Sequence, residues 1–207
     1  MSSKPDVSQM RRAQIIEAAT AVFTEKGLDR ATMAEIADAA GINKATIYLY
    51  FDSKAALTQA IAEAIFAQEL ADLQAAYESP GTAIERLTAF YEALIRDEGL
   101  IADKVGVLPL MPIIYEFYAL GLRRDDVRAV LADFLNHSAA LLAAIIQEGI
   151  ESGEFVATTD PSRAARALDE LMSGTVLHWV YTPEEVDVNA QFRYGIQLIF
   201  QGLIKHK

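Results

Sequence analysis

Apolar residues recur every three to four positions along almost the whole chain, the spacing of a helix that buries one face. No segment of strand length alternates cleanly between apolar and polar residues. A short unit before residue 55 is followed by a much longer stretch of apolar helix. The pattern predicts an all-α protein, with a three-helix N-terminal domain over residues 1–55 and a larger helical domain over residues 56–207.

Capping residues divide the larger domain into helices. Ser53 and Asp160 stand where N-caps are expected, and Thr82 is followed by Glu85 at the spacing of a capping box. Segment 106–112 contains one glycine and two prolines, so we expect an irregular break there. The expected helices cover residues 53–77, 82–95, 125–152, 161–181 and 187–207.

The N-terminal domain holds a compact helix-turn-helix pattern. Thr32 and Glu35 have the spacing of a capping box, and the helix that they open reaches Gly41, which can take the left-handed conformation that ends a helix. Asn43 is a good N-cap for the short helix that follows. Two helices joined by such a tight turn form a unit that reads the major groove of DNA.

The segment TMAEIADAAGINKATIYLYFDSK, residues 32–54, resembles the DNA-binding signature of the TetR family of bacterial transcriptional regulators. That signature reads T-x-x-x-I-A-x-x-A-G-[VI]-x-[KR]-[GA]-T-[LI]-Y-x-[YH]-F-x-[SN]-K. The resemblance covers about the first 60 residues. The matching residues are Thr32, Ile36, Ala37, Ala40, Gly41, Ile42, Lys44, Ala45, Thr46, Ile47, Tyr48, Tyr50, Phe51, Ser53 and Lys54.

The resemblance implies a ligand-responsive DNA-binding regulator. We expect a homodimer on a pseudo-palindromic double-stranded operator, released by a small apolar or amphipathic effector, and repression is the family's usual mode. The alternative is a DNA-binding structural or cell-division factor of the same fold without an effector. An enzyme is not expected, because the chain has no G-x-S-x-G, P-loop or G-x-G-x-x-G motif.

Composition argues against several other classes of protein. The chain has no cysteine and three histidines without H-x3-H spacing, so we expect neither a metal nor a cofactor. It has no uninterrupted apolar run of membrane-spanning length and no secretion signal, which predicts a cytoplasmic protein. The net charge is −11, yet residues 1–55 hold seven basic and seven acidic residues. The excess negative charge therefore lies outside the DNA-binding domain.

We expect DNA contacts along the short helix that begins after Asn43 and at the starts of the helices on either side of it. Lys44 and Ala45 lie at its leading edge, where base edges are met, and Asn43 either reads a base or only caps the helix. A cation at a helix start opposes the helix dipole, so an external partner is expected for Lys54. The candidate DNA-binding residues are Thr32, Asn43, Lys44, Ala45, Thr46, Tyr48, Tyr50 and Lys54.

The last two helices are unusually apolar. Their apolar residues either pack within the chain or, as the resemblance implies, form a four-helix seam between two subunits. The candidate dimer-interface residues are Leu168, Met172, Phe192, Ile196, Ile199 and Phe200. Gly174, Gly195 and Gly202 allow close helix approach.

Aromatic residues near the expected break are candidates for an effector site, with plain core packing as the alternative. The candidate effector-binding residues are Phe90, Met111, Tyr115, Tyr118 and Trp179. Glu116, beside Tyr115 in sequence, can complete an aromatic and anionic cage for a cationic ligand.

Overall fold

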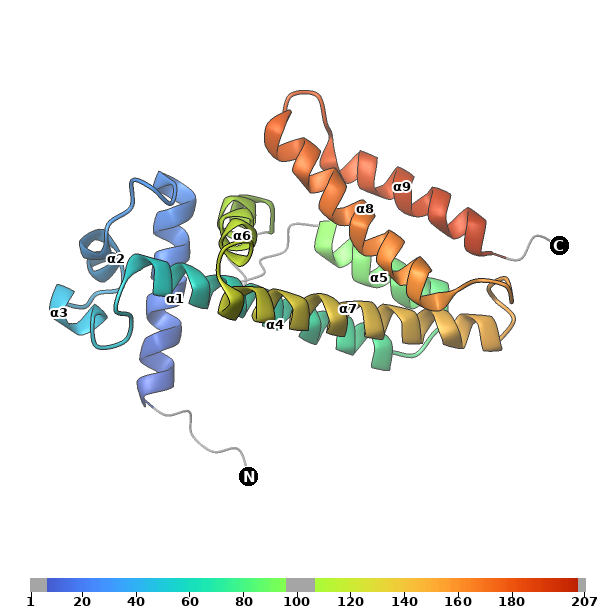
Figure 1. Cartoon of the computed structure of the whole chain (residues 1–207), viewed down its shortest axis with the longest axis horizontal. Helices are drawn as coiled ribbons and strands as arrows, with labels where there is room; N and C mark the ends of the chain where they lie inside the picture. Colours follow the sequence, from blue (N-terminus) through green and yellow to red (C-terminus); the bar gives the residue numbers. More distant parts are fainter. Residues whose placement is uncertain (1–6, 96–106, 205–207) are drawn as a thin grey trace. The chain divides into compact units, whose positions relative to one another are not determined.

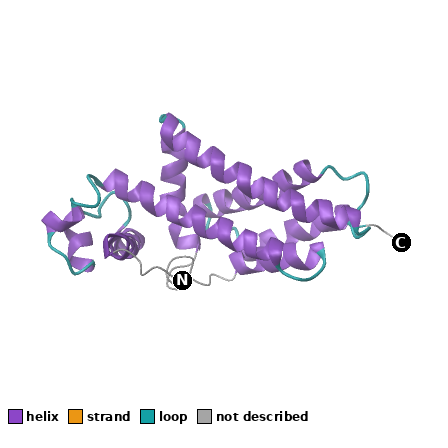
Figure 2. Ribbon diagram, turned by 90° about the horizontal axis from the view of Figure 1, so that it is seen from below, coloured by secondary structure: helices purple, strands orange, loops and turns teal. Residues whose placement is uncertain are grey.

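A computed structural model describes residues 7–95 and 107–204 of the chain, and these residues form nine α-helices joined by loops (Figures 1 and 2). Within these ranges the only β-type pairing is an isolated bridge between Phe155 and Ile204. The all-α prediction is confirmed. The helices are α1 (Val7–Lys26), α2 (Met33–Ala39), α3 (Lys44–Ile47), α4 (Lys54–Glu78), α5 (Ala83–Ile95), α6 (Val107–Gly121), α7 (Asp125–Glu151), α8 (Pro161–Tyr181) and α9 (Val188–Leu203).

The described residues fall into two compact units. Unit 1 comprises residues 7–68 and 107–130, and unit 2 comprises residues 69–95 and 131–204. Helices α4 and α7 each supply residues to both units. The functional division between residues 55 and 56 stays a prediction.

Unit 1 is built around the helix-turn-helix. Helix α2 packs against α1 and α3, and α6 packs against α1. Aromatic pairs join α4 to α6, because the Phe66 ring lies 5.8 Å from that of Phe117 and stacks on that of Tyr118 at 6.2 Å. The fully buried side chains of unit 1 include Ile15, Ile36, Ile47, Leu57, Ile61 and Phe117.

The expected break at 106–112 is wrong from residue 107 onward, because α6 runs continuously from Val107 to Gly121. Pro112 lies inside this helix, where its ring removes one N–H donor from the hydrogen-bond ladder. Ile113, Ile114 and Phe117 on the same helix are buried. Burial of this apolar face outweighs the lost hydrogen bond. Gly106 lies outside the described residues.

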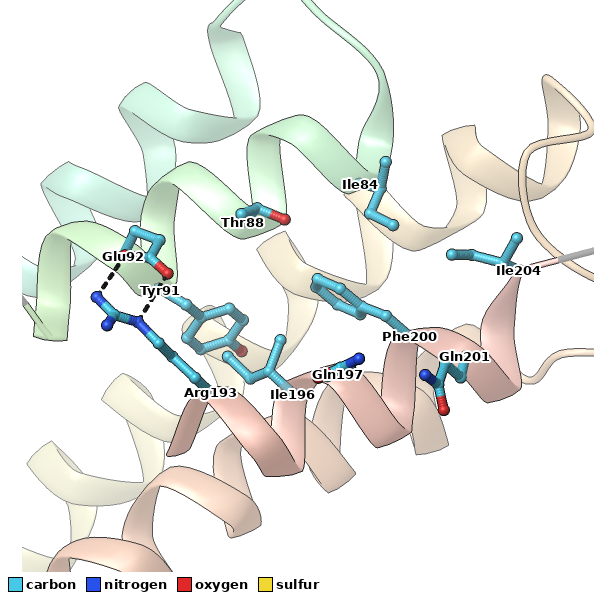
Figure 3. A pocket seen from close by; sticks show the side chains of 10 residues that line it. All are labelled: Ile84, Thr88, Tyr91, Glu92, Arg193, Ile196, Gln197, Phe200, Gln201 and Ile204. Carbon is cyan, nitrogen blue, oxygen red and sulfur yellow. Dashed lines mark hydrogen bonds and ion pairs between the residues drawn. The ribbon is translucent and has the colours of Figure 1, made fainter. Parts of the chain in front are cut away.

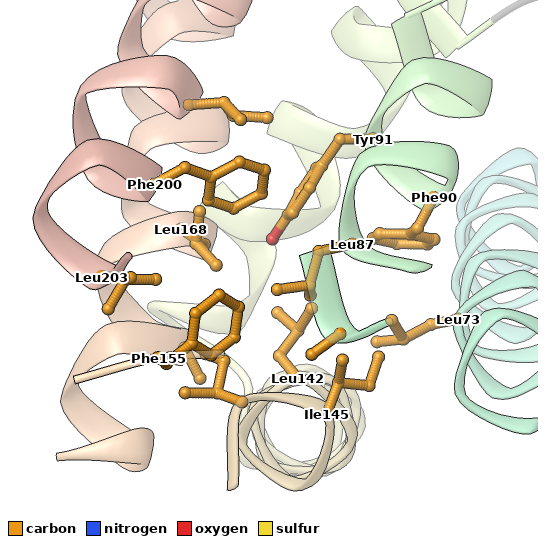
Figure 4. Packing of buried hydrophobic residues seen from close by; sticks show 14 of the residues in the cluster. Leu73, Leu87, Phe90, Tyr91, Leu142, Ile145, Phe155, Leu168, Phe200 and Leu203 are labelled. Carbon is orange, nitrogen blue, oxygen red and sulfur yellow. The ribbon is translucent and has the colours of Figure 1, made fainter. Parts of the chain in front are cut away.

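In unit 2, α8 and α9 pack against each other. Helix α9 lies beside α5, and the guanidinium of Arg193 on α9 binds the carboxylate of Glu92 on α5 through two hydrogen bonds of 3.1 and 2.9 Å (Figure 3). Side chains from α4, α5, α7, α8 and α9 form one apolar core (Figure 4). Gly195 permits the close packing of α8 on α9, because a Cβ there would lie 2.5 Å from Leu171.

Helix α7 is long and apolar enough to cross a membrane by length and composition, with a mean hydropathy of 1.7 over its best window. Its residues Leu142, Ile145 and Ile146 are fully buried in the core of unit 2. Part of the apolar face of this helix is therefore buried by packing within unit 2.

Candidate functional site

The start of α2 is fixed by the capping box expected from sequence. The Glu35 backbone N–H donates to Thr32 Oγ1 at 3.3 Å, and the Thr32 N–H donates to Glu35 Oε2 at 2.9 Å. Lys26 at the end of α1 donates to the same carboxylate at 2.7 Å. The Lys26 ammonium, followed by the two donors of Thr32, lowers the pKa of Glu35 to about 2. The Thr32 hydroxyl also donates to Glu35, so it is used inside the chain.

The turn between α2 and α3 follows from Gly41. Its φ of 65° is left-handed, a conformation that glycine adopts without a Cβ clash. The Gly41 N–H donates to the Asp38 carbonyl at 3.1 Å, and the Ile42 N–H donates to the Ala37 carbonyl at 3.0 Å. This pair of bonds is a Schellman motif, and it sets the direction in which the chain enters α3.

Helix α3 is short, and its orientation is fixed by a cap at its N-terminus and by buried side chains on its inner face. Asn43 Oδ1 accepts hydrogen bonds from the Thr46 N–H at 2.8 Å and from the Thr46 hydroxyl at 2.9 Å. Ile47 and Phe51 are buried, and the Arg12 guanidinium lies over the Phe51 ring at 4.4 Å from its centroid. The opposite face of the helix is therefore directed toward solvent.

The outward face carries several of the expected DNA contacts. Lys44 and Ala45 are exposed, and the Lys44 ammonium forms no hydrogen bond or ion pair with the described part of the chain. Tyr48 is 43% exposed and Tyr50 is half-buried. Together with Thr32, Asn43 and Thr46, these residues lie on or beside the helix-turn-helix, although the side chains of the last three are engaged in caps.

Lys54 differs from its expectation. Its ammonium donates to the backbone carbonyls of Leu28 at 2.7 Å, Asp29 at 3.2 Å and Ala31 at 3.2 Å. These acceptors lie in the loop that joins α1 to α2, so the unfavourable position of the cation at the start of α4 is balanced within the chain. An external partner is not required to hold this lysine in place, and its contact with DNA stays a prediction.

Four of the six candidate dimer-interface residues are buried within the single chain. Leu168, Phe192, Ile196 and Phe200 are at most 8% exposed and belong to the core of unit 2. The alternative of intramolecular packing therefore describes these four. Met172 and Ile199 are partly buried at the edge of that core. The exposed large apolar side chains of α8 and α9 are Leu177, Tyr181, Tyr194 and Leu198.

The five candidate effector residues are divided between the two units. Met111, Tyr115 and Tyr118 lie on α6 in unit 1, where Met111 is buried and the two tyrosine rings meet edge to face at 5.9 Å. Phe90 on α5 is buried in the core of unit 2, and Trp179 on α8 is half-buried. These effector contacts stay predictions.

Glu116 is exposed on α6, and its place in a cage for a cationic ligand stays a prediction. Sequence patterns missed two half-buried carboxyl groups with raised pKa values, Glu69 on α4 and Asp169 on α8. An acidic residue on a long helix resembles a solvated surface residue, so no local signal identified these two.

Two of the larger hollows among the described residues of unit 2 have ligand size. One of about 390 Å³ lies between α5 and α9, with Tyr91, Ile196 and Phe200 along its apolar floor and the Glu92–Arg193 ion pair at its rim (Figure 3). The other, of about 620 Å³, lies between α8 and the segment leading into α9, and Gly174 and His178 are among its lining residues. Both are open to solvent.

Family comparisons cover most of the chain. A family model described as bacterial regulatory proteins of the tetR family matches residues 15–61. A second model, described as the C-terminal part of BetI-type transcriptional repressors, matches residues 83–194. The second match alone spans more than half of the chain.

Individual relatives match this chain over most of their length. The HTH-type transcriptional regulator TtgR of Pseudomonas putida is 28% identical over 186 residues, which cover 87% of this chain and 85% of that protein. FadR of Bacillus subtilis, solved in complex with stearoyl-CoA, is 26% identical with a TM-score of 0.66, and the match covers 91% of this chain and 97% of that one. SmeT, the repressor of the Stenotrophomonas maltophilia efflux pump SmeDEF, has a TM-score of 0.71 at 20% identity, over 97% of this chain and 93% of that one.

Proposed function

Because the chain belongs to the TetR family of bacterial transcriptional regulators, we propose that it is a dimeric cytoplasmic repressor whose operator affinity is controlled by a small molecule. The observation that carries this proposal is the exposed, unpaired Lys44 at the start of α3, on a helix-turn-helix whose backbone is fixed by caps. The matched relatives are regulators, which favours this function over a structural factor without an effector.

We assign the DNA contacts by chemistry. Lys44 and Ala45 meet base edges in the major groove, where an ammonium can bind guanine and a methyl group can touch thymine. Tyr48 and Tyr50 offer hydroxyls to phosphate oxygens, which position the protein without reading sequence. Lys54 acts mainly by holding the α1–α2 loop, and it adds positive charge near the same face.

Dimerisation is proposed through the outward faces of α8 and α9. Tyr194 and Leu198 lie one turn apart on α9, and both are more than half exposed. A Cβ added at Gly174 or at Gly202 would meet no atom within 4 Å, so both glycines lie on open faces that another helix can approach. A second copy packed there gives the two-fold symmetry that a pseudo-palindromic operator requires.

The effector is proposed to be apolar or amphipathic. The FadR relative was solved with stearoyl-CoA, a ligand with a long apolar chain and a polar head. The candidate contacts of its apolar part remain Met111, Tyr115 and Tyr118 for a site in unit 1, and Phe90 and Trp179 for a site in unit 2. A ligand need only favour the DNA-free state by about 1–3 kcal/mol to release the operator.

The proposed function is tested by selecting bound sequences from random duplex DNA. We expect an inverted repeat whose half-sites lie about one helical turn, roughly 34–36 Å, apart. Anisotropy of the selected duplex then reports its release by a library of amphipathic compounds. Tyr115→Ala should weaken release by a compound that binds at that residue. A selection without any enriched sequence would contradict the DNA-reading function itself.

A further inference from the structure

Four helices of unit 2 each place one polar side chain in or beside its apolar core, two of them buried (Tyr91, Ser138) and two half-buried (Glu69, Asp169). They are Glu69 on α4, Tyr91 on α5, Ser138 on α7 and Asp169 on α8. Tyr91 is 3% exposed, and Figure 4 shows its oxygen directed into the core. Its hydroxyl has no hydrogen-bond partner within the described residues. Buried hydroxyls are normally paired, so this one requires an explanation.

The charge around this hydroxyl is negative and uncompensated. The Ser138 hydroxyl donates to Asp169 Oδ1 at 3.4 Å, but neither Asp169 nor Glu69 forms an ion pair within residues 7–95 and 107–204. Two arginines of unit 2 form ion pairs with other carboxylates. Arg86 binds Glu148 at 2.5 Å and Arg193 binds Glu92 at 2.9 Å.

The proton affinities of these groups reflect their surroundings. Burial, followed by the charges of Asp169 and Asp72, raises the pKa of Glu69 to about 7. Burial raises the pKa of Asp169 to about 6, despite the hydrogen bond from Ser138. The same carboxylates add to the effect of burial in raising the pKa of the Tyr91 hydroxyl. All three groups therefore lie within electrostatic range of one another.

We propose that Glu69, Tyr91 and Asp169 form the polar end of the effector site in unit 2 and bind the primary ammonium head of an amphipathic cation. The inference rests on the proposed control by a small molecule. A primary ammonium has three N–H donors, and the two carboxylates and the tyrosine oxygen supply three acceptors. Its positive charge compensates the acidic pair, which favours the charged state of both partners.

The surroundings suit the apolar body of such a ligand. The Phe90 and Phe192 rings lie 5.1 and 5.5 Å from the Tyr91 ring, and aromatic faces attract cations. A metal ion fits less well, because the described residues contain no group of three or more His, Asp or Glu side chains placed to hold one. The site is therefore assigned to an organic cation.

The test compares ligands that differ in the sign of their head group. Calorimetry on the full chain uses octylammonium and 2-naphthylmethylammonium as cations and octanoate as the anion, at about pH 8, where both carboxyls are mainly ionised. We expect both cations to bind at least about tenfold more tightly than octanoate, since a hydrogen bond to a charged group has that worth. Cation affinity should fall at about pH 5.5, as the carboxyls take up protons.

Three variants separate recognition from folding. Asp169→Asn and Glu69→Gln keep the side-chain shape and remove the charge, and each should lower cation affinity by about tenfold or more. Tyr91→Phe removes only the hydroxyl and should lower it less. Glu151→Gln removes an exposed carboxylate at the end of α7 and is the control that should leave binding unchanged. Circular dichroism checks that each variant is folded.

The possible results distinguish failure of the proposed cation site from failure of the proposed regulatory function. Three results would each overturn the inference. In the first, octanoate binds as tightly as the cations, and in the second, neither cation binds. In the third, the folded double variant Glu69→Gln/Asp169→Asn binds the cations with unchanged affinity. If another compound releases the selected duplex in any of these cases, the proposed function stands. If cation binding depends on the two carboxylates but does not change DNA affinity, the binding site is supported. Control of DNA binding by this ligand is then contradicted.

Discussion

The ammonium of Lys54 at the start of α4 donates to the backbone carbonyl of Leu28 at 2.7 Å, across 26 positions of sequence. The same ammonium reaches the carbonyls of Asp29 and Ala31. The first residue of α4 thus fixes the loop that leads into α2. Because the turn and α3 follow α2, their position also depends on this contact. One side chain joins the long helix to the DNA-reading unit.

This relationship predicts a double effect of Lys54→Ala. Three backbone carbonyls lose a charged donor, so the free energy of unfolding should fall by about 1–3 kcal/mol. DNA affinity should fall for all sequences alike, because the change acts on the scaffold and on total charge. Chemical denaturation and anisotropy on specific and random duplexes measure the two effects. Unchanged stability would show that the carbonyl contacts contribute nothing.

Lys44→Ala should separate binding from stability. Its ammonium is exposed and has no partner within the described residues, so the unfolding free energy should stay within about 0.5 kcal/mol of wild type. DNA affinity should fall, and the salt dependence of binding should decrease by about one unit per protomer. A changed base preference in the selected half-site would indicate a base contact. Lys44→Arg is the matched control, because it keeps the charge.

The capping box at Thr32 predicts a specific acid sensitivity. The pKa of Glu35 is lowered from 4.5 to about 2 by Lys26 and Thr32, so its contribution to stability is present above about pH 4.5 and is lost as the pH falls toward 2. Glu35→Gln should remove that part of the acid dependence. Thr32→Ala should cost about 1 kcal/mol at neutral pH through the lost cap. Identical acid titrations of wild type and Glu35→Gln would refute this prediction.

Features encoded by neighbouring residues were predictable from the sequence. The caps at Thr32, Asn43 and Asp160 depend on residues three positions away, and the structure contains all three. Gly41 similarly identified its own turn. These interactions are local, so the sequence order alone brings the partners together.

Features that depend on distant partners were not predictable. The sequence shows Lys54 only as a cation at a helix start, because its carbonyl acceptors lie at least 23 positions away. Periodicity identified the apolar faces of α8 and α9, but it does not reveal whether a face meets the same chain or another copy. Glu69 and Asp169 become unusual only when the folded helices bring them together and partly bury them.

The burial of α9 therefore changes which substitutions should break a dimer. Tyr194→Glu and Leu198→Glu place a charge on the open face, so we expect folded monomers that lose operator binding. Ile196→Glu and Phe200→Glu place it in the core of unit 2 and should unfold the protein. Light scattering and circular dichroism distinguish these results.

The control for this series is Leu122→Glu. Leu122 is 80% exposed and lies in unit 1, away from both helices in sequence, so this variant should remain dimeric. The wild-type interface should bury at least about 1,200 Å² in total, the area of a stable complex. A monomeric wild type at micromolar concentration, or a dimeric Tyr194→Glu/Leu198→Glu variant, would remove the assignment to these faces.

The acidic pair inside unit 2 predicts that the protein loses stability as the pH rises. The pKa of Glu69 is raised from 4.5 to about 7, and that of Asp169 from 3.8 to about 6. Each carboxyl therefore favours the folded state most below its unfolded pKa, and this advantage is lost as the pH rises through the folded pKa. Between about pH 4 and 7 the free energy of unfolding should fall because both carboxyls ionise in an enclosed position.

Glu69→Gln removes that ionisation. Relative to wild type, the variant should gain roughly 1–3 kcal/mol at about pH 8 and little at about pH 4, since the half-buried side chain is partly screened by water. Glu116→Gln, at an exposed position, should show no such difference between the two pH values. Denaturation at both pH values measures the effect. A gain of equal size at both would mean that Glu69 destabilises the fold by its packing rather than by its charge, and the electrostatic account of the cluster would then be wrong.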